Sequence, residues 1–375
     1  MSADSATHAV TNQPPPFEDR NLYETDTVLR EAVVREGGER SAARLDAFGE
    51  MAGSAEMQEQ GRLANAHPPV LRTHDRQGRR LDVVEFHPAY HRLMEASCAE
   101  GLHASVWEHL GRGDQTPAAG RHVARAGAFY MATQMEAGHC CPVTMSSAAV
   151  ATLTLEPRVA GDWIQKILSR TYDKDFVPRA DKRGVTLGMG MTEKQGGTDV
   201  RANTSVARPA GPGGSGEEYI LVGHKWFMSA PMSDAFLVLA QAPGGLTCFL
   251  VPRFLPDGEV NALHFQRLKD KLGNRSNASS EVVFRDAYAL RVGEEGKGIR
   301  TIIQMVQLTR QDCAIASAGL MRSGLAHALH HARHRSVFQK HLADQPLMQA
   351  VLADMALHVE ASIALVIRLC RAFDR

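Results

Sequence analysis

The sequence predicts an α+β protein that is mostly helical, with an N-terminal helical domain, a middle β-barrel or sandwich, and a C-terminal helical bundle. Three observations support this prediction. Apolar residues recur at helical spacing up to about residue 170, short β-rich runs separated by glycine clusters follow, and helical spacing returns near residue 298. With 375 residues, 44% of them hydrophobic, the chain is long enough for two or three domains.

The first part of the chain, residues 1–180, is predicted to be the helical domain. From Thr27 to Arg170 apolar residues recur three and four positions apart, as in Leu93, Met94, Cys98 and Leu102. Proline and glycine divide the pattern into pieces at His67-Pro68-Pro69 and at Asp75-Arg76-Gln77-Gly78.

The middle part, residues 181–292, is predicted to be the β domain. Its β-rich runs are short and glycine-rich turns separate them, which favours a small barrel or sandwich. The runs cover residues 219–222, 235–240, 246–251 and 282–284.

The last part, residues 293–375, is predicted to begin a helical bundle. Helical spacing runs from Gly298 to Phe338, a rod of roughly 60 Å, and a second helix begins near Pro346. The two helices carry more apolar surface than they can bury against each other. We therefore expect the bundle to be incomplete in this chain, with the remainder truncated or supplied by another chain.

Composition limits the possible classes of function. Lys plus Arg and Asp plus Glu are equal at 42 each, so the chain has no overall charge that favours nucleic acid or an anionic membrane. The polar N-terminus lacks a secretory signal, and we see no apolar stretch long enough to cross a bilayer. We expect a soluble, cytoplasmic protein. The scattered cysteines predict reduced, mostly buried thiols and no metal site.

A glycine-rich segment from Gly190 to Asp199 is the most informative part of the sequence. It follows a β-like run and combines small residues, two hydroxyls and backbone N–H groups in one turn. Such a loop can approach a planar cofactor or a phosphate closely. It is neither a Walker A loop nor GxGxxG. From composition alone, an ordinary glycine-rich turn is an equally good interpretation.

Two segments in order resemble the flavin-binding signatures of the acyl-CoA dehydrogenase family. The first is Gly190 to Ala202, and the second is Gly223-His224-Lys225-Trp226-Phe227-Met228-Ser229. The resemblance implies that family's helix, barrel and bundle architecture and an FAD cofactor. It assigns flavin contacts to Met189, Met191, Thr192, Gly197 and Thr198 in the first segment and to Phe227, Met228 and Ser229 in the second.

In this resemblance Phe227 covers the flavin ring and Ser229 lies near its N5 atom. An aromatic or sulfur contact suits a flat apolar ring, and hydrogen bonds tune its electron affinity. The alternative for Trp226, Phe227 and Met228 is the core of the barrel.

A third match concerns the adenosine half of FAD. Arg335, Phe338 and Gln345 resemble the family residues that reach FAD bound to a neighbouring subunit. The sequence departs from the family pattern at Gln339, where glycine is common, and at His341, where proline is common. The alternative for Arg335 is a solvated arginine on an amphipathic helix.

A narrower resemblance, from about residue 12 to residue 374, is to the adaptive-response members of the family, which are associated with DNA alkylation. It implies a homotetramer, double-stranded DNA binding through a C-terminal region absent here, and weak dehydrogenase activity. The segments that carry it include residues 61–65, 136–145, 191–197 and 269–278.

No catalytic base can be named in this chain. Acyl-CoA dehydrogenation needs a carboxylate to remove the α-proton. In most of the family this glutamate lies beyond the point where this chain ends, and the alternative position holds Thr309, before Arg310. Three hypotheses follow: an FAD enzyme acting on acyl-CoA or a related small molecule, a DNA-binding protective flavoprotein with little activity, or a fragment without function.

Overall fold

The computed structural model describes residues 8–113 and 117–374. Helices form the N-terminal part, and a β-hairpin interrupts them. These elements are α1 Thr27–Arg35, α2 Ala42–Ala52, α3 Ala55–Ala66, β1 Val70–His74, β2 Arg80–Glu85, α4 Pro88–Glu100, α5 Glu108–Gly111, α6 Arg121–Met135, α7 Cys140–Leu153 and α8 Pro157–Ile167. The hairpin was not predicted, although the sequence pattern broke just before its first strand and again at its turn.

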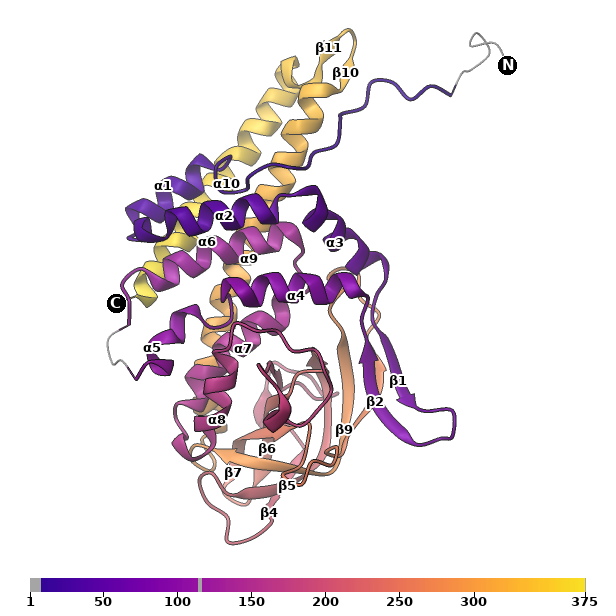
Figure 1. Ribbon diagram of the computed structural model, residues 1–375, viewed down its shortest axis with the longest axis vertical. Coiled ribbons are helices and arrows are strands. Elements are labelled where there is room, and N and C mark those ends of the chain that lie inside the picture. Colours follow the sequence, from indigo (N-terminus) through magenta and orange to yellow (C-terminus); the bar gives the residue numbers. More distant parts are fainter. Residues whose placement is uncertain (1–7, 114–116, 375) are drawn as a thin grey trace.

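The middle part is a barrel of short and long strands (Figure 1). Its strands are β3 Leu187–Gly190, β4 Val206–Pro209, β5 Glu218–Ser229, β6 Ala235–Ala242, β7 Gly245–Pro252, β8 Leu263–Leu268 and β9 Ser279–Val292. The sheet runs β3-β6-β4-β5-β9-β7, and β7 pairs back onto β6, which closes the barrel. The barrel, predicted as one of two options, is therefore confirmed.

Two long helices dominate the C-terminal part. They are α9 Gly298–His334 and α10 Pro346–Phe373, and a small hairpin of β10 Ser336–Val337 and β11 Lys340–His341 joins them. The first helix ends four residues before the predicted Phe338, because the chain turns into this hairpin, where Phe338 and Gln339 have positive φ. Pro346 begins α10 as predicted, since its missing N–H has no partner in a first helical turn anyway.

Local signals explain where several helices begin and end. The carboxylate of Asp26 caps α1 by accepting from the Leu29 amide, and the Ser54 hydroxyl caps α3 at Met57. Helix α4 starts at Pro88 and ends at Glu100, where Gly101 caps it with a φ of 79° that suits glycine.

Three apolar cores hold the parts together. The first core contains residues of the four helices α1, α2, α3 and α4, of α6, of the middle of α9 and of α10. The second lies between α7, α8 and the start of α9 on one side and β3, β6 and β7 on the other. The third fills the barrel. In Figure 1, α9 runs from the barrel to the far end of the helical part, so a single helix connects all three regions.

Helix α10 corrects one prediction. By length and composition Pro346–Phe373 could cross a membrane, whereas we expected no such stretch. This helix contains too few charged residues to exclude a membrane span by composition. Its buried side, which includes Val359, Ile363 and Ile367, packs in the helical core. Leu357 and Leu365 on its other side are 67% and 70% exposed.

Candidate functional site

The two glycine-flanked segments singled out by the sequence meet at one edge of the barrel. Met189 lies on β3, Met191 and Thr192 follow it, and Phe227 and Ser229 end β5. The amide of Trp226 donates to the carbonyl of Thr192 at 2.8 Å, which joins the segments directly. We call Met189, Met191, Thr192, Phe227 and Ser229 the barrel-edge strip.

A β-bulge turns Phe227 outward. In the pairing of β5 with β9, Lys225 opposes Val282 while Met228 opposes Ser280, so three steps on β5 match two on β9. As a result Phe227 is 48% exposed. The ammonium of Lys269 lies 4.5 Å from the centre of the Phe227 ring.

Met228 has the opposite orientation. Its side chain is fully buried in the core of the barrel, so the barrel-core alternative holds for this side chain. Any flavin contact at this position would therefore come from its backbone. Ser229, the next residue, returns to the surface, where its hydroxyl lies 2.9 Å from that of Ser279.

A buried ion pair shapes the loop that follows β3. The ammonium of Lys225 lies 2.7 Å from the carboxylate of Glu193, and both side chains are fully buried. Glu193 also accepts from the amide and hydroxyl of Thr204 and from the amide of Ser205. Burial alone would raise the pKa of Glu193, but these donors, Lys225 first, hold it at about 2. The carboxylate therefore stays charged and fixes the loop.

The loop offers hydrogen-bonding groups that the described residues leave unused. Among the described residues, no partner bonds the amides of Gly197 and Thr198 or the hydroxyls of Thr192 and Thr198. A side chain at Gly197 would stand 2.5 Å from the Thr192 hydroxyl, so glycine allows the loop to fold over this residue. Free donors beside a half-exposed aromatic ring fit a flavin.

A polar group that we did not predict lies beside Ser229. The ammonium of Lys271 donates to the carbonyl of Asn277 and lies 3.4 Å from the Ser279 hydroxyl. The side-chain oxygen of Asn277 is buried without a partner among the described residues. Burial raises the pKa of the nearby Cys141 thiol to about 11, so this thiol is protonated at neutral pH. These residues fall in segments that carried the resemblance, but nothing in their spacing showed that they meet.

Glu136 fastens this polar group to the helical part. Its carboxylate accepts from Asn65 at 2.8 Å, from the Ser276 hydroxyl at 2.9 Å and from two amides, those of Gly138 and His139. Burial alone would raise the pKa of Glu136, but hydrogen bonds from its partners, His139 first, lower it to about 2. One charged residue thus holds α3, α6 and the 269–278 segment in register.

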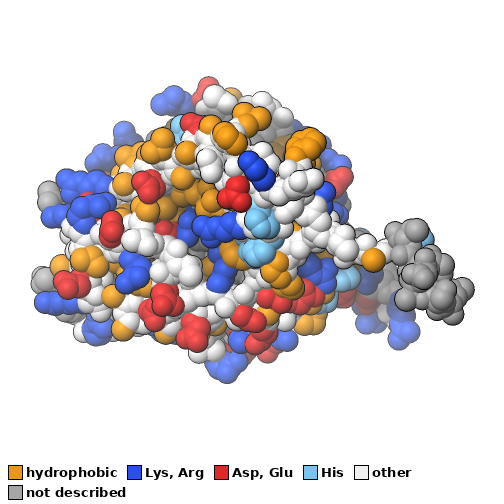
Figure 2. Space-filling model, turned by 90° about the horizontal axis from the view of Figure 1, so that it is seen from above, with side chains coloured by type: hydrophobic (Ala, Val, Ile, Leu, Met, Phe, Trp, Pro, Cys, Tyr) orange, Lys and Arg blue, Asp and Glu red, His pale blue; other side chains and the backbone are white. Residues whose placement is uncertain are grey.

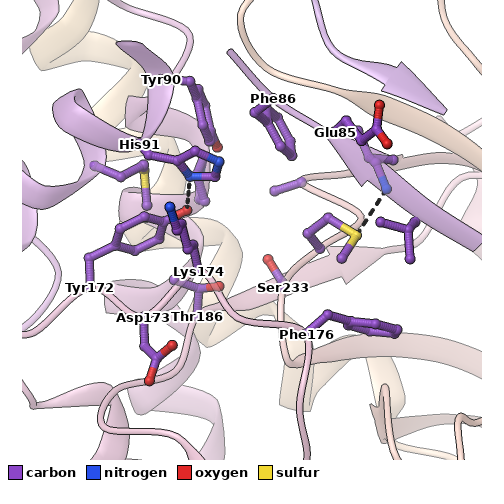
Figure 3. Close-up of a pocket in the computed structure, with 16 residues that line it drawn as sticks. Glu85, Phe86, Tyr90, His91, Tyr172, Asp173, Lys174, Phe176, Thr186 and Ser233 are labelled. Atoms are coloured by element: carbon purple, nitrogen blue, oxygen red, sulfur yellow. Dashed lines mark hydrogen bonds between the residues drawn. The ribbon is translucent and has the colours of Figure 1, made fainter. Parts of the chain in front are cut away.

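A cavity of about 270 Å³ opens next to the end of β5. Figure 3 shows it between the end of β2, α4 and the segment that follows α8, with His91 and Tyr172 pointing toward each other. The His91 ring lies 3.0 Å from the Tyr172 hydroxyl, and burial lowers the pKa of His91 to about 4. With Phe86 and Phe176 also in its wall, the cavity suits a ligand with an apolar body and a polar group.

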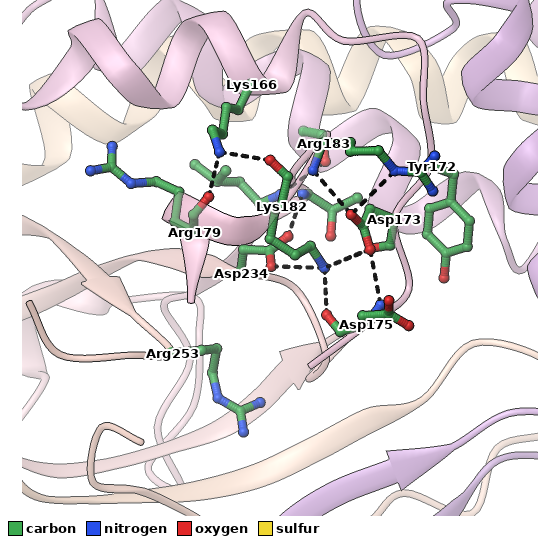
Figure 4. Close-up of polar contacts among 12 residues, drawn as sticks. Lys166, Tyr172, Asp173, Asp175, Arg179, Lys182, Arg183, Asp234 and Arg253 are labelled. Carbon is green, nitrogen blue, oxygen red and sulfur yellow. Dashed lines mark hydrogen bonds and ion pairs between the residues drawn. The ribbon is translucent and has the colours of Figure 1, made fainter. Parts of the chain in front are cut away.

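A buried lysine fixes one wall of this cavity (Figure 4). The ammonium of Lys182 donates to the carbonyls of Asp173 and Asp175 and lies 3.2 Å from the carboxylate of Asp234. Asp234 also accepts from the amide of Thr186. Burial raises the pKa of Asp234 to about 6, although Lys182 opposes this shift. The network ties the segment after α8 to the start of β6.

The predicted adenosine contacts lie away from the barrel-edge strip, at the far end of α9 (Figure 1). Phe338 is 90% exposed at the tip of the hairpin. The guanidinium of Arg335 donates to the carbonyl of Asn12, and the side-chain amide of Gln345 donates to the carbonyl of Val337. This chain therefore does not bring these three residues to the strip, and contact with a neighbouring subunit's FAD stays a prediction.

Helix α9 provides no free carboxylate. The Thr309 hydroxyl is buried and donates to the carbonyl of Val306. The single carboxylate of this helix, Asp312, forms two bonds to the Arg125 guanidinium at 2.6 and 2.7 Å and accepts from Thr144.

Comparisons with known proteins match the whole length of the chain. Three family models match in succession: the adaptive response protein AidB N-terminal domain over residues 12–174, the acyl-CoA dehydrogenase middle domain over 188–287 and the acyl-CoA dehydrogenase C-terminal domain over 296–375. The chain is 51% identical over 370 residues to the putative acyl-CoA dehydrogenase AidB of Escherichia coli, covering 98% of this chain and 66% of that protein.

More distant relatives share the fold. The chain is 28% identical over 371 residues to acyl-CoA dehydrogenase family member 11 of Caenorhabditis elegans, of which it spans 57%. The crystal structure of Caenorhabditis elegans ACDH-11 in complex with C11-CoA aligns with a TM-score of 0.85 at 26% identity, over 100% of this chain and 64% of that one. The Bd2924 apo-form aligns with a TM-score of 0.84 at 25% identity, over 96% of this chain and 71% of that one.

Proposed function

The chain belongs to the acyl-CoA dehydrogenase family and has an AidB-type N-terminal domain, and from this membership we propose that it is an FAD-dependent oxidoreductase acting on an acyl-CoA thioester or a related small molecule. The main structural support for this proposal is the barrel-edge strip. It presents a half-exposed ring, two half-buried methionines and the unpaired hydroxyl of Thr192 at one edge of the barrel. The acyl-CoA substrate class is supported by the C11-CoA complex of the nematode relative.

FAD would lie along the strip, with Phe227 against the ring and Ser229 at its polar edge. When bound, FAD accepts a hydride from the substrate. The chain's own contribution is to hold the ring in place and to exclude water from one of its faces. The Glu193–Lys225 pair fixes the loop whose free amides and hydroxyls would bind the cofactor's polar groups.

The first test is the visible absorbance spectrum of the purified chain, with the released cofactor identified by chromatography. We expect a bound-flavin spectrum and FAD. Phe227→Ala should weaken FAD binding by about 30-fold, since losing the ring contact costs on the order of 2 kcal/mol. Val222→Ala is the matched control, because Val222 lies on the same strand and is 39% exposed. A colourless protein that takes up no added FAD, or equal FAD binding by both variants, would contradict the assignment.

Substrate class is tested anaerobically on the flavin-loaded protein. Addition of C11-CoA or isovaleryl-CoA should bleach the flavin absorbance if the chain oxidises acyl-CoA. Because α9 has no free carboxylate, we expect any bleaching to be slow unless a base comes from elsewhere in the assembly. No bleaching with either compound, in protein that does hold FAD, would remove the enzymatic proposal and leave the cofactor assignment intact.

A second candidate is a DNA-binding protective flavoprotein, which the similarity to an adaptive response protein favours. It predicts that a DNA duplex binds at low salt and is released as the ionic strength rises. We also propose that the protein assembles as a homotetramer in the cytoplasm, which light scattering and cell fractionation would test. The absence of any duplex binding at low salt would leave the oxidoreductase as the single candidate.

A further inference from the structure

A second concave site lies far from the strip, where the N-terminal segment crosses α9. A pocket of about 390 Å³ is lined there by Phe17, Arg20, Thr25, Arg322, Ala326, Leu329, His330 and Arg333. Figure 2, seen from above, shows Lys and Arg side chains and His side chains gathered near the middle of this end of the molecule. The pocket lining includes three arginines and no carboxylate.

The charges in this pocket are unbalanced. Arg322 pairs with the buried Asp26 at 3.1 Å, and its guanidinium also donates to the carbonyl of Thr25. Among the described residues, the guanidinium groups of Arg20 and Arg333 have neither a carboxylate partner nor a hydrogen bond. Burial, together with the charge of Arg322, lowers the pKa of Arg20 to about 10. Arg20 thus lies close to Arg322 in a partly buried space, with the exposed Arg333 also lining the pocket, and an anion would relieve the repulsion between these cations.

The aromatic side chains make the site rigid. The Phe17 ring stacks on His330 with centroids 4.3 Å apart, and the Arg20 guanidinium covers Phe17 at 3.9 Å. His327 packs edge-on against Phe17 at 5.1 Å. Because Arg20 is held against a ring, its guanidinium is already positioned before a ligand binds.

Two segments far apart in the sequence form the walls. One wall is the N-terminal segment, and the other is a face of α9 on which positions 322, 326, 329, 330 and 333 recur at helical spacing. The His330 ring lies 2.8 Å from the carbonyl of Pro15, and Asn12 bonds twice with Ser336. The N-terminal segment is therefore already fastened to α9 on one side of the pocket.

We propose that this pocket binds a phosphate group, either as the free ion or as the phosphate of a small nucleotide. Arginine forks match the oxygens of phosphate, and a doubly charged anion satisfies two unpaired guanidinium groups at once. The pocket volume is in the range of small-ligand sites. Bound phosphate bridges the two walls and holds the N-terminal segment on α9.

The test is isothermal titration of the purified, flavin-loaded chain with inorganic phosphate and with AMP at low ionic strength. We expect saturable binding. Arg20→Met and Arg333→Met should each weaken it at least tenfold, because each removes charge-assisted hydrogen bonds. Arg40→Met is the matched control, since Arg40 is exposed and lies outside the pocket. Arg322 is left unchanged because its loss would leave Asp26 buried without its cation.

The outcomes separate the sources of the phosphate. Equal affinity for both ligands would assign the site to the phosphate group alone, and AMP binding tenfold tighter would assign it to a nucleotide. FAD content should be the same in all variants, which distinguishes this pocket from the flavin site. Failure of both ligands to bind the unmodified chain, or equal binding by Arg20→Met, Arg333→Met and Arg40→Met, would overturn the proposal. So would binding of a DNA duplex through these arginines without binding of either small ligand.

Discussion

Replacing Lys225 by methionine tests the role of the buried ion pair behind the barrel-edge strip. Methionine keeps the length of the side chain but leaves Glu193 charged, fully buried and without its cation. Removing one partner of such a pair costs about 3–5 kcal/mol. At about 2–4 °C per kcal/mol, the value for domains of about 150–250 residues, the melting temperature should fall by roughly 10 °C.

The assay is thermal unfolding followed by calorimetry and by tryptophan fluorescence, because Trp226 is bonded to this loop. Lys194→Met is the matched control: Lys194 lies in the same loop but is exposed, and its replacement should change stability by about 0.5 kcal/mol or less. If Lys225→Met lowers the free energy of unfolding no more than Lys194→Met does, the buried pair does not fix the loop. Flavin content measured on the same samples should fall with Lys225→Met and remain unchanged with Lys194→Met.

The pH dependence gives an independent check of the same reasoning. The folded protein holds the pKa of Glu193 at about 2, below its ordinary value of 4.5, so the stabilisation is present above pH 4.5 and is lost as the pH falls toward 2. In Lys225→Met burial is no longer opposed by the ammonium, so the pKa of Glu193 should rise. The stability difference between the variant and the unmodified chain should therefore narrow as the pH falls below the raised pKa of Glu193 in the variant and on toward 2. A constant difference over this range would show that Glu193 is not the group left uncompensated.

Two further changes probe other polar contacts. Glu136→Gln should lower the free energy of unfolding by about 2–4 kcal/mol and expose residues 269–278 to trypsin, because a side-chain amide cannot accept from all four donors. Glu59 is exposed, so the control variant Glu59→Gln should change neither the stability nor the cleavage by trypsin. His91→Gln should make stability less sensitive to acid between about pH 6.5 and 4, because burial lowers the folded pKa of His91 to about 4, so protonating it favours unfolding. The measurement is the free energy of unfolding from urea titrations across this pH range, with the exposed His341→Gln as control. If both variants showed the same pH dependence as the unmodified chain, the lowered pKa of His91 would be contradicted.

The helices, the β-rich runs and the flavin loop could be predicted because their signals are local. Periodicity three and four apart, the proline at 346 and the glycine-rich turn after β3 depend on neighbours within a few residues. The β1–β2 hairpin was missed because its strands are short and mostly exposed, so their alternation is weak. The hairpin at Phe338 was missed because Gln339 takes a positive φ that a sequence pattern does not favour.

The sequence by itself determined the family resemblance, the order of the three parts and the segments that form the barrel-edge strip. The tertiary structure decided which way each side chain of the strip points: the bulge in β5 turns Phe227 outward and leaves Met228 in the core. It also brought together Glu193 with Lys225 and Arg20 with Arg322. The members of each of these two sets are far apart in the chain. Their distance, and therefore their attraction or repulsion, is set only by the packing of the folded protein.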